Sequence, residues 1–232
     1  INLEYLTYLT SNINFDNVNS ILDFGCGIGN LGFALKKKFN HIDLYCIEND
    51  QNCKKILKER GYKNYEDINK IDKKFDLIIS LHVLEHLTNL KPVSKLIKLM
   101  NPKGYFFYEV PNTDFDEGYK KRIFDSPHLI FFNKKNVERV FIDNGLNRIS
   151  SLKSSYSIQH DIENQLISKK KYVNMKFFSK IKQIILRIEP NISSNLRRKI
   201  SLFKQHFSDD KLKWYINGYK NARCLRGIYQ KS

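Results

Sequence analysis

The sequence predicts an α/β fold in which helices cover both faces of a parallel sheet. Short apolar runs that end at turn residues alternate with amphipathic segments through residues 1–150, and this strict alternation is typical of parallel sheets. A chain of 232 residues with 41% hydrophobic and 13% aromatic residues is also long and apolar enough to bury a core. In a sheet of this kind, ligands bind beyond the carboxyl ends of the strands.

Each predicted element has a local signal. Apolar runs flanked by turn residues predict strands, and apolar residues at helical spacing predict helices. Asp50 can cap the second helix and Gly61 can end it, while the turn residues 101–104 separate the third helix from the strand that follows. The predicted strands cover residues 20–24, 42–48, 62–66, 75–80, 105–110, 148–154 and 222–229, and the predicted helices cover residues 30–38, 50–60, 90–100 and 133–144.

Residues 157–221 break this alternation. Isoleucine, leucine and phenylalanine recur there at helical spacing, with lysine and arginine between them, which predicts a basic helical insertion before the last strand. We therefore expect one domain formed by residues 1–156 and 222–232, with residues 157–221 as an insertion or cap. The insertion could be a lid over an anionic acceptor, an amphipathic segment that contacts a membrane surface, an RNA-binding surface, or only a structural cap or dimer contact.

The net charge of +16 is concentrated near the carboxyl terminus. Residues 1–150 hold 22 basic and 19 acidic side chains, a net charge of +3, whereas residues 151–232 hold 18 basic and 5 acidic ones, a net charge of +13. Such an excess favours an anionic partner, such as a phosphate, a nucleotide, nucleic acid or an acidic membrane surface. The alternative is that lysine is simply the default surface residue of a chain rich in lysine, asparagine and isoleucine.

Composition also excludes several classes of protein. No apolar run approaches the roughly 20 residues that a membrane-spanning helix needs, and no signal-peptide pattern follows Ile1. The four cysteines form no C-x-x-C pair, so a disulfide framework is not expected. These features predict a cytoplasmic protein with reduced thiols.

A glycine-rich loop is the strongest signal of a ligand site. Gly25, Gly27 and Gly29 follow the first predicted strand and precede the first predicted helix, and glycine lets a ligand approach backbone N–H groups closely. The spacing from Gly27 onward also matches a dinucleotide fingerprint, so an NAD-dependent oxidoreductase is one alternative. However, the carboxylate of Asp23 at the start of this loop would repel a pyrophosphate and attract an ammonium group.

Acidic residues after the next two predicted strands extend this pattern. Glu48 can accept two hydrogen bonds from a ribose diol, and Asp67 with Ile68 can contact the amino group and the ring of an adenine. Asp67 could equally be a surface acid. An ammonium group, a ribose and an adenine without phosphates describe S-adenosylmethionine.

These motifs make residues 20–150 resemble class I S-adenosylmethionine-dependent methyltransferases. The matching pieces are the segments ILDFGCGIG at 21–29, FDLIISLHVLEHL at 75–87 and NPKG at 101–104, together with Glu48 and the pair Pro111–Asn112. The resemblance implies a Rossmann-like sheet of seven strands whose last strand is antiparallel, and S-adenosylmethionine as cofactor. The cofactor-binding residues that it implies are Asp23, Gly25, Cys26, Gly27, Gly29, Glu48, Asn49, Asp67, Ile68, Leu81 and His82.

A second group of residues follows the fourth predicted strand. His82, Glu85 and His86 share one helix face if this turn is helical. Ubiquinone-pathway O-methyltransferases and small-RNA 3′-end methyltransferases use Glu-x-x-Glu-His here for a metal, but His82 replaces the first glutamate, and Mg²⁺ prefers oxygen ligands. A divalent metal is therefore an alternative rather than the expectation. Its candidate ligands are His82, Glu85, His86 and His128, the last of which resembles the downstream histidine of these families.

The same residues are candidates for proton transfer. A histidine close to the reacting methyl group can take a proton from an acceptor hydroxyl or amine, although His86 could instead be a structural hydrogen-bonding residue. Glu109 is unusual in an otherwise apolar strand and must meet a polar partner or face the site. The candidate catalytic residues are thus His86, His128, Glu109 and His82.

The sequence therefore predicts a methyltransferase that moves a methyl group to an oxygen or nitrogen atom of a small anionic acceptor. A nucleotide-linked sugar, a glycan or a phosphorylated intermediate would fit, and the resemblance suggests surface-polysaccharide biosynthesis. An RNA methyltransferase and a non-catalytic cofactor-binding protein are the alternatives. Nothing in the sequence predicts the oligomeric state.

Overall fold

A computed structural model of the chain describes residues 3–114, 127–154 and 224–232, which belong to one compact unit. The seven strands of this unit form a single sheet. In chain order they are Ser20–Phe24 (β1), Asp43–Ile47 (β2), Tyr62–Tyr65 (β3), Phe75–Leu81 (β4), Met100–Pro111 (β5), Leu146–Ser154 (β6) and Cys224–Lys231 (β7).

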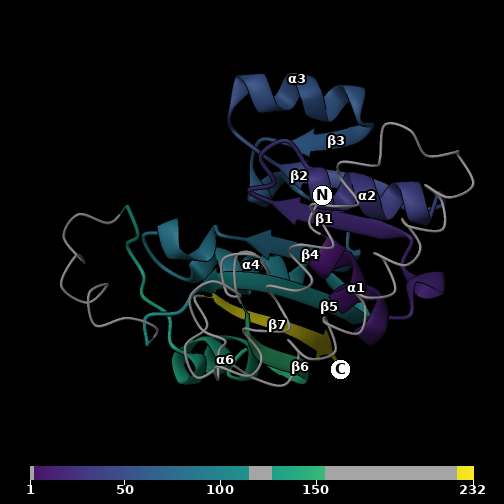
Figure 1. Cartoon of the computed structure of the whole chain (residues 1–232). Coiled ribbons are helices and arrows are strands. Elements are labelled where there is room, and N and C mark those ends of the chain that lie inside the picture. Colours follow the sequence, from purple (N-terminus) through teal and green to yellow (C-terminus); the bar gives the residue numbers. More distant parts are fainter. Residues whose placement is uncertain (1–2, 115–126, 155–223) are drawn as a thin grey trace, which may run out of the picture. The chain divides into compact units, whose positions relative to one another are not determined.

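The order of the strands in the sheet is β3-β2-β1-β4-β5-β7-β6, and Figure 1 shows them in this sequence from top to bottom. Strands β1 to β5 pair in parallel, whereas β7 lies antiparallel to both β5 and β6. The predicted seven-stranded Rossmann-like sheet with an antiparallel last strand is therefore confirmed.

Helices pack on both faces of the sheet, as predicted. The helices are Leu3–Asn12 (α1), Asn30–Lys38 (α2), Gln51–Glu59 (α3), Lys91–Lys98 (α4) and Lys134–Ile142 (α6), and the short 3₁₀ turns are Phe15–Asn17, Ile68–Lys70 and Leu84–His86. Helices α1, α2 and α3 contribute Leu9, Leu35 and Leu57 to one buried apolar cluster. Helices α4 and α6 contribute Leu96 and Phe141 to a second cluster, so each face of the sheet has its own core.

Local signals fix the starts of two helices. The side chain of Asp50 accepts hydrogen bonds from the backbone N–H groups of Asn52 and Cys53, at 2.9 and 2.8 Å, which confirms the predicted cap of α3. Asn133 and Asn136 form a reciprocal capping box at the start of α6. The two caps satisfy backbone donors that the helices leave without an intrahelical partner.

The structure differs from the sequence analysis at three elements. Helix α1 was not predicted, because its sequence LEYLTYLTSN contains threonine and tyrosine, which are poor helix formers. Strand β5 begins at Met100 rather than 105, because Met100 pairs with Phe75 before the turn residues and the ladder resumes at Tyr105. The turn after β4 is helical only from Leu84 to His86, so His82 does not share a helix face with Glu85 and His86.

The predicted insertion at residues 157–221 lies outside the described residues. Ser154, at the end of β6, and Cys224, at the start of β7, are register partners, and Cys224 also pairs with Pro111 at the end of β5. The described chain therefore leaves and re-enters the sheet at its carboxyl edge. This is the edge where ligands bind in parallel sheets.

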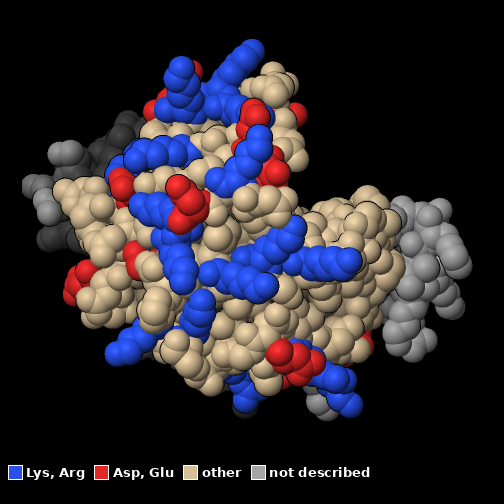
Figure 2. Space-filling view, turned by 180° about the vertical axis from the view of Figure 1, so that it is seen from behind, with Lys and Arg blue, Asp and Glu red and all other residues tan. Residues whose placement is uncertain are grey.

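Charges on the described residues are mixed. Figure 2 shows lysine and arginine side chains over much of the face seen from behind, with acidic side chains between them. This matches the small net charge of residues 1–150. Of the helices that the structure describes, none combines the length and apolar character needed to cross a membrane.

Candidate active site

A cavity of about 220 Å³ lies at the carboxyl end of β1 and β4. Four of the predicted cofactor-binding residues meet there, and helices α1 and α2 supply further residues. Its lining residues are Tyr5, Asp23, Gly25, Cys26, Asn30, Leu31 and Leu81. The other predicted cofactor-binding residues do not line this cavity, namely Gly27, Gly29, Glu48, Asn49, Asp67, Ile68 and His82.

Asp23 is the ionisable group buried in this cavity. It is the next-to-last residue of β1 and is 4% exposed. Burial raises the pKa of Asp23 to about 7, the carboxylate of Glu48 acts in the same direction, and the hydroxyl of Tyr62 opposes them. A cation placed beside this carboxyl would stabilise its charged form, as predicted for the ammonium group of the cofactor.

The glycines of the loop serve different purposes. A side chain at Gly29 would lie 2.7 Å from both Leu57 and Tyr62, so close packing and a φ of +69° exclude one. Gly27 also has a positive φ, but no atom lies within 4 Å of where its Cβ would be. Gly29 is thus required by the fold, whereas Gly27 leaves open space for a ligand.

Cys26 adds a thiol to the same loop. A hydrogen bond with the Cys46 thiol and burial raise the pKa of Cys26. A protonated thiol is a poor nucleophile, which agrees with its interpretation as a small loop residue.

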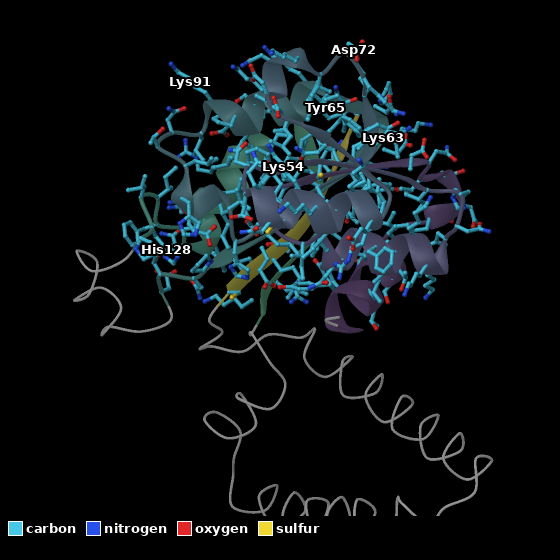
Figure 3. The ribbon with its side chains drawn as sticks, turned by 90° about the horizontal axis from the view of Figure 1, so that it is seen from above. Lys54, Lys63, Tyr65, Asp72, Lys91 and His128 are labelled. Carbon is cyan, nitrogen blue, oxygen red and sulfur yellow. The ribbon has the colours of Figure 1, made fainter. Side chains whose placement is uncertain are left out.

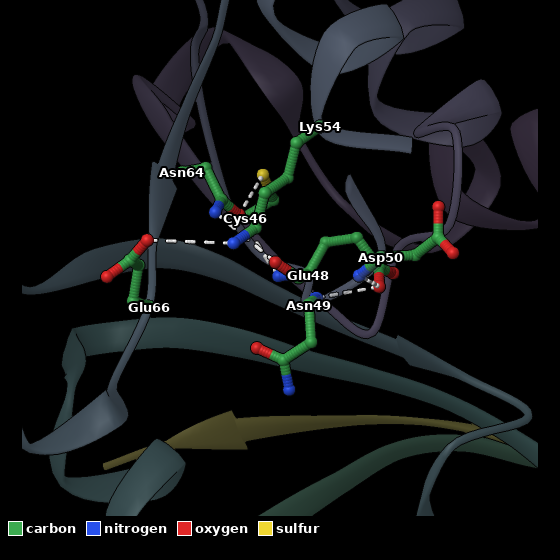
Figure 4. A network of polar contacts seen from close by, with 7 residues as sticks. All are labelled: Cys46, Glu48, Asn49, Asp50, Lys54, Asn64 and Glu66. Atoms are coloured by element: carbon green, nitrogen blue, oxygen red, sulfur yellow. Dashed lines mark hydrogen bonds and ion pairs between the residues drawn. The ribbon is translucent and has the colours of Figure 1, made fainter. Parts of the chain in front are cut away.

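Glu48 follows β2 and is held by backbone groups, in the network that Figure 4 shows. Its Oε1 accepts hydrogen bonds from the N–H groups of Asn49 and Asp50, at 2.7 and 2.9 Å, and its Oε2 accepts one from Gly27 at 2.8 Å. Asn64 on β3 accepts a hydrogen bond from the Glu48 N–H at 3.0 Å. The carboxylate is therefore fixed, and each oxygen retains acceptor capacity for a ribose hydroxyl.

Asp67 and Ile68 do not line the cavity. Asp67 caps the 3₁₀ turn that follows it, because its Oδ1 accepts hydrogen bonds from the backbone and side-chain N–H groups of Asn69, at 2.9 and 2.8 Å. The backbone hydrogen bond in particular lowers the pKa of Asp67. Ile68 packs against one of the two cores. Their predicted contact with adenine stays a prediction.

Glu109 meets polar partners, which was one of its two predicted outcomes. The carboxylate is fully buried and binds the Tyr5 hydroxyl at 2.5 Å, the Nε of Arg226 at 2.6 Å and the Nε2 of His82 at 3.1 Å. Burial raises the pKa of Glu109, but Arg226, His82 and Tyr5 together lower it to about 2. The sequence missed Tyr5 and Arg226, although a lone arginine in the last apolar strand was a usable signal.

His82 faces carboxylates with both ring nitrogens. Its Nδ1 lies 3.5 Å from Oε1 of Glu85, and its Nε2 contacts Glu109. Burial lowers the pKa of His82, but the two carboxylates outweigh it and raise this pKa to about 9. A charged imidazolium has no lone pair to accept a proton, so this geometry favours a positioning role for His82 over that of a general base.

His86, in the turn after β4, lies beside His128. Their ring centroids are 4.9 Å apart, and His86 Nδ1 lies 3.3 Å from the carbonyl oxygen of Pro127. Burial lowers the pKa of His128, which leaves a neutral imidazole that can accept a proton. Figure 3 shows His128 away from Lys54, Lys63 and Tyr65.

The four candidate metal ligands do not form one set. Potential ligand atoms of Glu85, His86 and His128 lie within 4.8 Å of one another, whereas His82 groups with Glu109 and Cys224. The Glu85 carboxylate is buried and accepts no hydrogen bond within the described part of the chain. Metal binding stays an alternative.

Comparison with known proteins agrees with this geometry. Residues 4–151 match the family described as methyltransferase domain. An uncharacterized protein of Methanocaldococcus jannaschii is 32% identical over 94 residues, which is 40% of this chain and 41% of that protein. The chain thus spans less than half the length of this relative.

Two solved structures share the fold. A SAM-dependent methyltransferase from Archaeoglobus fulgidus superposes with a TM-score of 0.58 at 16% identity, covering 98% of this chain and 94% of that one. The O-methyltransferase from a trans-AT PKS multienzyme of Brevibacillus brevis, solved with S-adenosyl-L-homocysteine, gives a TM-score of 0.54 at 16% identity, covering 98% and 72%.

Proposed function

The chain belongs to the methyltransferase-domain family and uses S-adenosylmethionine, and we propose that it methylates an oxygen or nitrogen atom of a small acceptor. The single observation that carries this proposal is the position of the cavity, which adjoins the turn bearing His82, Glu85 and His86. Leu81 lines the cavity, and Val83 packs against Gly25 of the glycine loop. The glycine loop, assigned to the methyl donor, is thus in contact with the turn assigned to the acceptor.

Residues in and beside the cavity fit the cofactor. Asp23, in the cavity wall, would hold its ammonium group. Glu48, whose Oε2 accepts a hydrogen bond from Gly27 of the same loop, would hold its ribose hydroxyls, and the space beside Gly27 lets the ligand approach the backbone. S-adenosylmethionine, when bound, supplies a methyl group that already carries its leaving group. The protein therefore needs to align the acceptor and to remove a proton.

His128 is the residue that we assign to proton removal. Its lowered pKa leaves the imidazole neutral, and the neighbouring His86 ring holds it in an edge-to-face contact. An acceptor hydroxyl or amine placed between this pair and the donor would lose its proton to imidazole as the new bond to carbon forms.

An anionic acceptor is the finer part of the proposal and rests on charge. The excess of +13 in residues 151–232 belongs mostly to the segment between Ser154 and Cys224, whose ends are anchored at the carboxyl edge of the sheet. A net charge of this sign favours an anionic acceptor. A nucleotide-linked sugar, a glycan or a phosphorylated intermediate would be such an acceptor, and RNA is the second candidate because of the same charge.

Transfer of labelled methyl groups tests this function. The protein is incubated with S-adenosylmethionine labelled with ¹³C in the methyl group and, separately, with pools of nucleotide-sugars, soluble glycans, phosphorylated metabolites and total RNA. We expect label in one small-molecule pool, and its carbon chemical shift distinguishes O-methyl from N-methyl products. Label only in RNA would support the second candidate, and cofactor binding without transfer to any pool would contradict an enzymatic role.

A further inference from the structure

Tyr5 is the residue of the cavity wall that precedes the first strand of the sheet. It comes from α1, outside the glycine loop, and lines the cavity together with Asp23, Gly25 and Leu81. Helix α1 is held to the sheet through Leu9 and Tyr8, which are both buried. A residue of the first helix therefore faces the space assigned to the methionine half of the cofactor.

Buried charges hold the Tyr5 ring in place. Its hydroxyl donates a hydrogen bond to Oε1 of Glu109 at 2.5 Å, and Oε2 of the same carboxylate binds Nε of Arg226 at 2.6 Å. The Arg226 guanidinium also lies 4.5 Å from the centre of the Tyr5 ring. Edge contact with Phe107, at 6.0 Å between ring centroids, completes the support.

Burial of the Glu109–Arg226 ion pair costs free energy, and a role in positioning another residue would explain why the pair is present. Glu109 and Arg226 are 0% and 5% exposed, and burying an ion pair is often no more favourable than burying apolar residues of the same size. The pair joins β5 to β7 across the sheet, and a phenol from α1 is its additional partner. Burial and Glu109 raise the pKa of Tyr5 far above its ordinary value, so the phenol remains a donor.

Tyr8 shows what a merely structural tyrosine in this helix looks like. It follows Tyr5 by one turn, lies 5.5 Å from Arg226 and 5.9 Å from Phe107, and is 2% exposed. It does not line the cavity, and no hydrogen bond joins its hydroxyl to Glu109 within the described residues. Both tyrosines contact Arg226 and Phe107, but only Tyr5 lines the cavity and binds the Glu109 carboxylate.

We propose that Tyr5 is a cofactor-contacting residue, with its ring as the wall of the cavity against the methionine half of S-adenosylmethionine, and that Glu109 and Arg226 position it. This inference rests on the family assignment but not on any acceptor. It makes α1 part of the cofactor site, which neither the glycine loop nor the strand ends indicate.

Calorimetric titration with S-adenosylhomocysteine tests the proposal, together with thermal unfolding of the unliganded protein. Tyr5→Ala should weaken binding by about tenfold or more, because a contact is lost. Tyr5→Phe keeps the ring but loses its anchor and should weaken binding by roughly two- to fivefold. The matched control Tyr8→Phe should bind as the wild type does, and Tyr8→Ala should lower Tm more than Tyr5→Ala while retaining its affinity.

Coupling between positions 5 and 109 tests the positioning role. If Glu109 acts on the ligand through Tyr5, Glu109→Gln should weaken binding of S-adenosylhomocysteine in the wild type but add little to Tyr5→Phe. Binding by Tyr5→Ala within twofold of the wild type would overturn the proposal, as would additive effects of the two substitutions. Tyr5→Phe keeps the test open if Tyr5→Ala does not fold. A wild type that binds no S-adenosylhomocysteine would instead contradict the family-based function.

Discussion

Removal of Arg226 should destabilise this protein far more than removal of an exposed arginine. Arg226 donates from Nε to the fully buried carboxylate of Glu109 at 2.6 Å. In Arg226→Met, the carboxylate loses its strongest counter-charge while it stays buried, and leaving one partner of a buried pair unpaired costs about 3–5 kcal/mol. For a chain of this length the loss corresponds to a fall in Tm of roughly 6–20 °C.

Arg148→Met is the matched control. Arg148, on the neighbouring strand β6, pairs with Glu138 of α6 at 3.3 Å, but its side chain is 52% exposed, and surface pairs contribute about 0–1 kcal/mol. Urea unfolding followed by circular dichroism gives both free energies of unfolding. A loss below about 1 kcal/mol for Arg226→Met, or one equal to that of Arg148→Met, would refute the view that this pair holds the site together.

The pH dependence of the same variant provides a second check. In the wild type, the pKa of Glu109 is lowered from 4.5 to about 2, so its contribution to stability is present above pH 4.5 and is lost as the pH falls toward 2. Without Arg226, burial favours the protonated carboxyl. The difference in stability between the wild type and Arg226→Met should therefore shrink as the pH is lowered from 7 to about 4. A constant difference would contradict this explanation.

Three further predictions concern the cofactor loop. The pKa of Asp23 is about 7 in the free protein, so the affinity for S-adenosylmethionine should fall below pH 7 by up to about tenfold per pH unit. Asp23→Asn should bind the cofactor weakly at every pH. Calorimetry that finds parallel pH profiles for the two proteins would contradict this. Gly29→Ala should lower the free energy of unfolding by about 2–4 kcal/mol, because of the positive φ at this position and its close approach to Leu57 and Tyr62. Gly27→Ala should lower it by about 1 kcal/mol but weaken cofactor binding more than Gly29→Ala does. Equal Tm values for the two variants would contradict this prediction. Tyr62→Phe should cost about 1–2 kcal/mol, because the Gly29 carbonyl loses a buried hydrogen bond of 2.9 Å, and urea unfolding with no change would exclude that contribution.

Part of the candidate site follows from local signals in the sequence. Asp23 and the three glycines are adjacent in the chain, and a loop between a strand and a helix at this position determines its own geometry. The cap by Asp50 is likewise a contact between neighbours. In the same way, the apolar runs specify the strands, and the alternation with helices specifies the parallel part of the sheet.

The residues that the sequence analysis missed are set by tertiary contacts. Pairing of Glu109 with Arg226 requires β5 and β7 to be neighbours, although 117 positions separate the two residues. Tyr5 is even less accessible to pattern analysis, because the placement of α1 depends on its contacts with the core. Asp67 illustrates the opposite difficulty, since a local cap uses the carboxylate that a ligand was expected to need.

Contacts outside its own turn explain why the role of His82 is difficult to predict from the sequence. The spacing of His82, Glu85 and His86 suggests a shared helix face, but His82 has a φ of +56° and lies outside the 3₁₀ turn. Its contact with Glu109 comes from the neighbouring strand and fixes the charge on the ring. The chemistry of this histidine is therefore determined by the pairing of β4 with β5.

A crystal structure with S-adenosylhomocysteine bound is the most direct test of the central claim, namely that the buried carboxyl of Asp23 and the fixed carboxylate of Glu48 bind the two ends of a nucleoside amino acid. We predict density for the amino group of the ligand beside Asp23, for its ribose hydroxyls beside Glu48, and for its homocysteine portion against Tyr5. Density for the ligand outside this cavity, or an amino group directed away from Asp23, would contradict the claim.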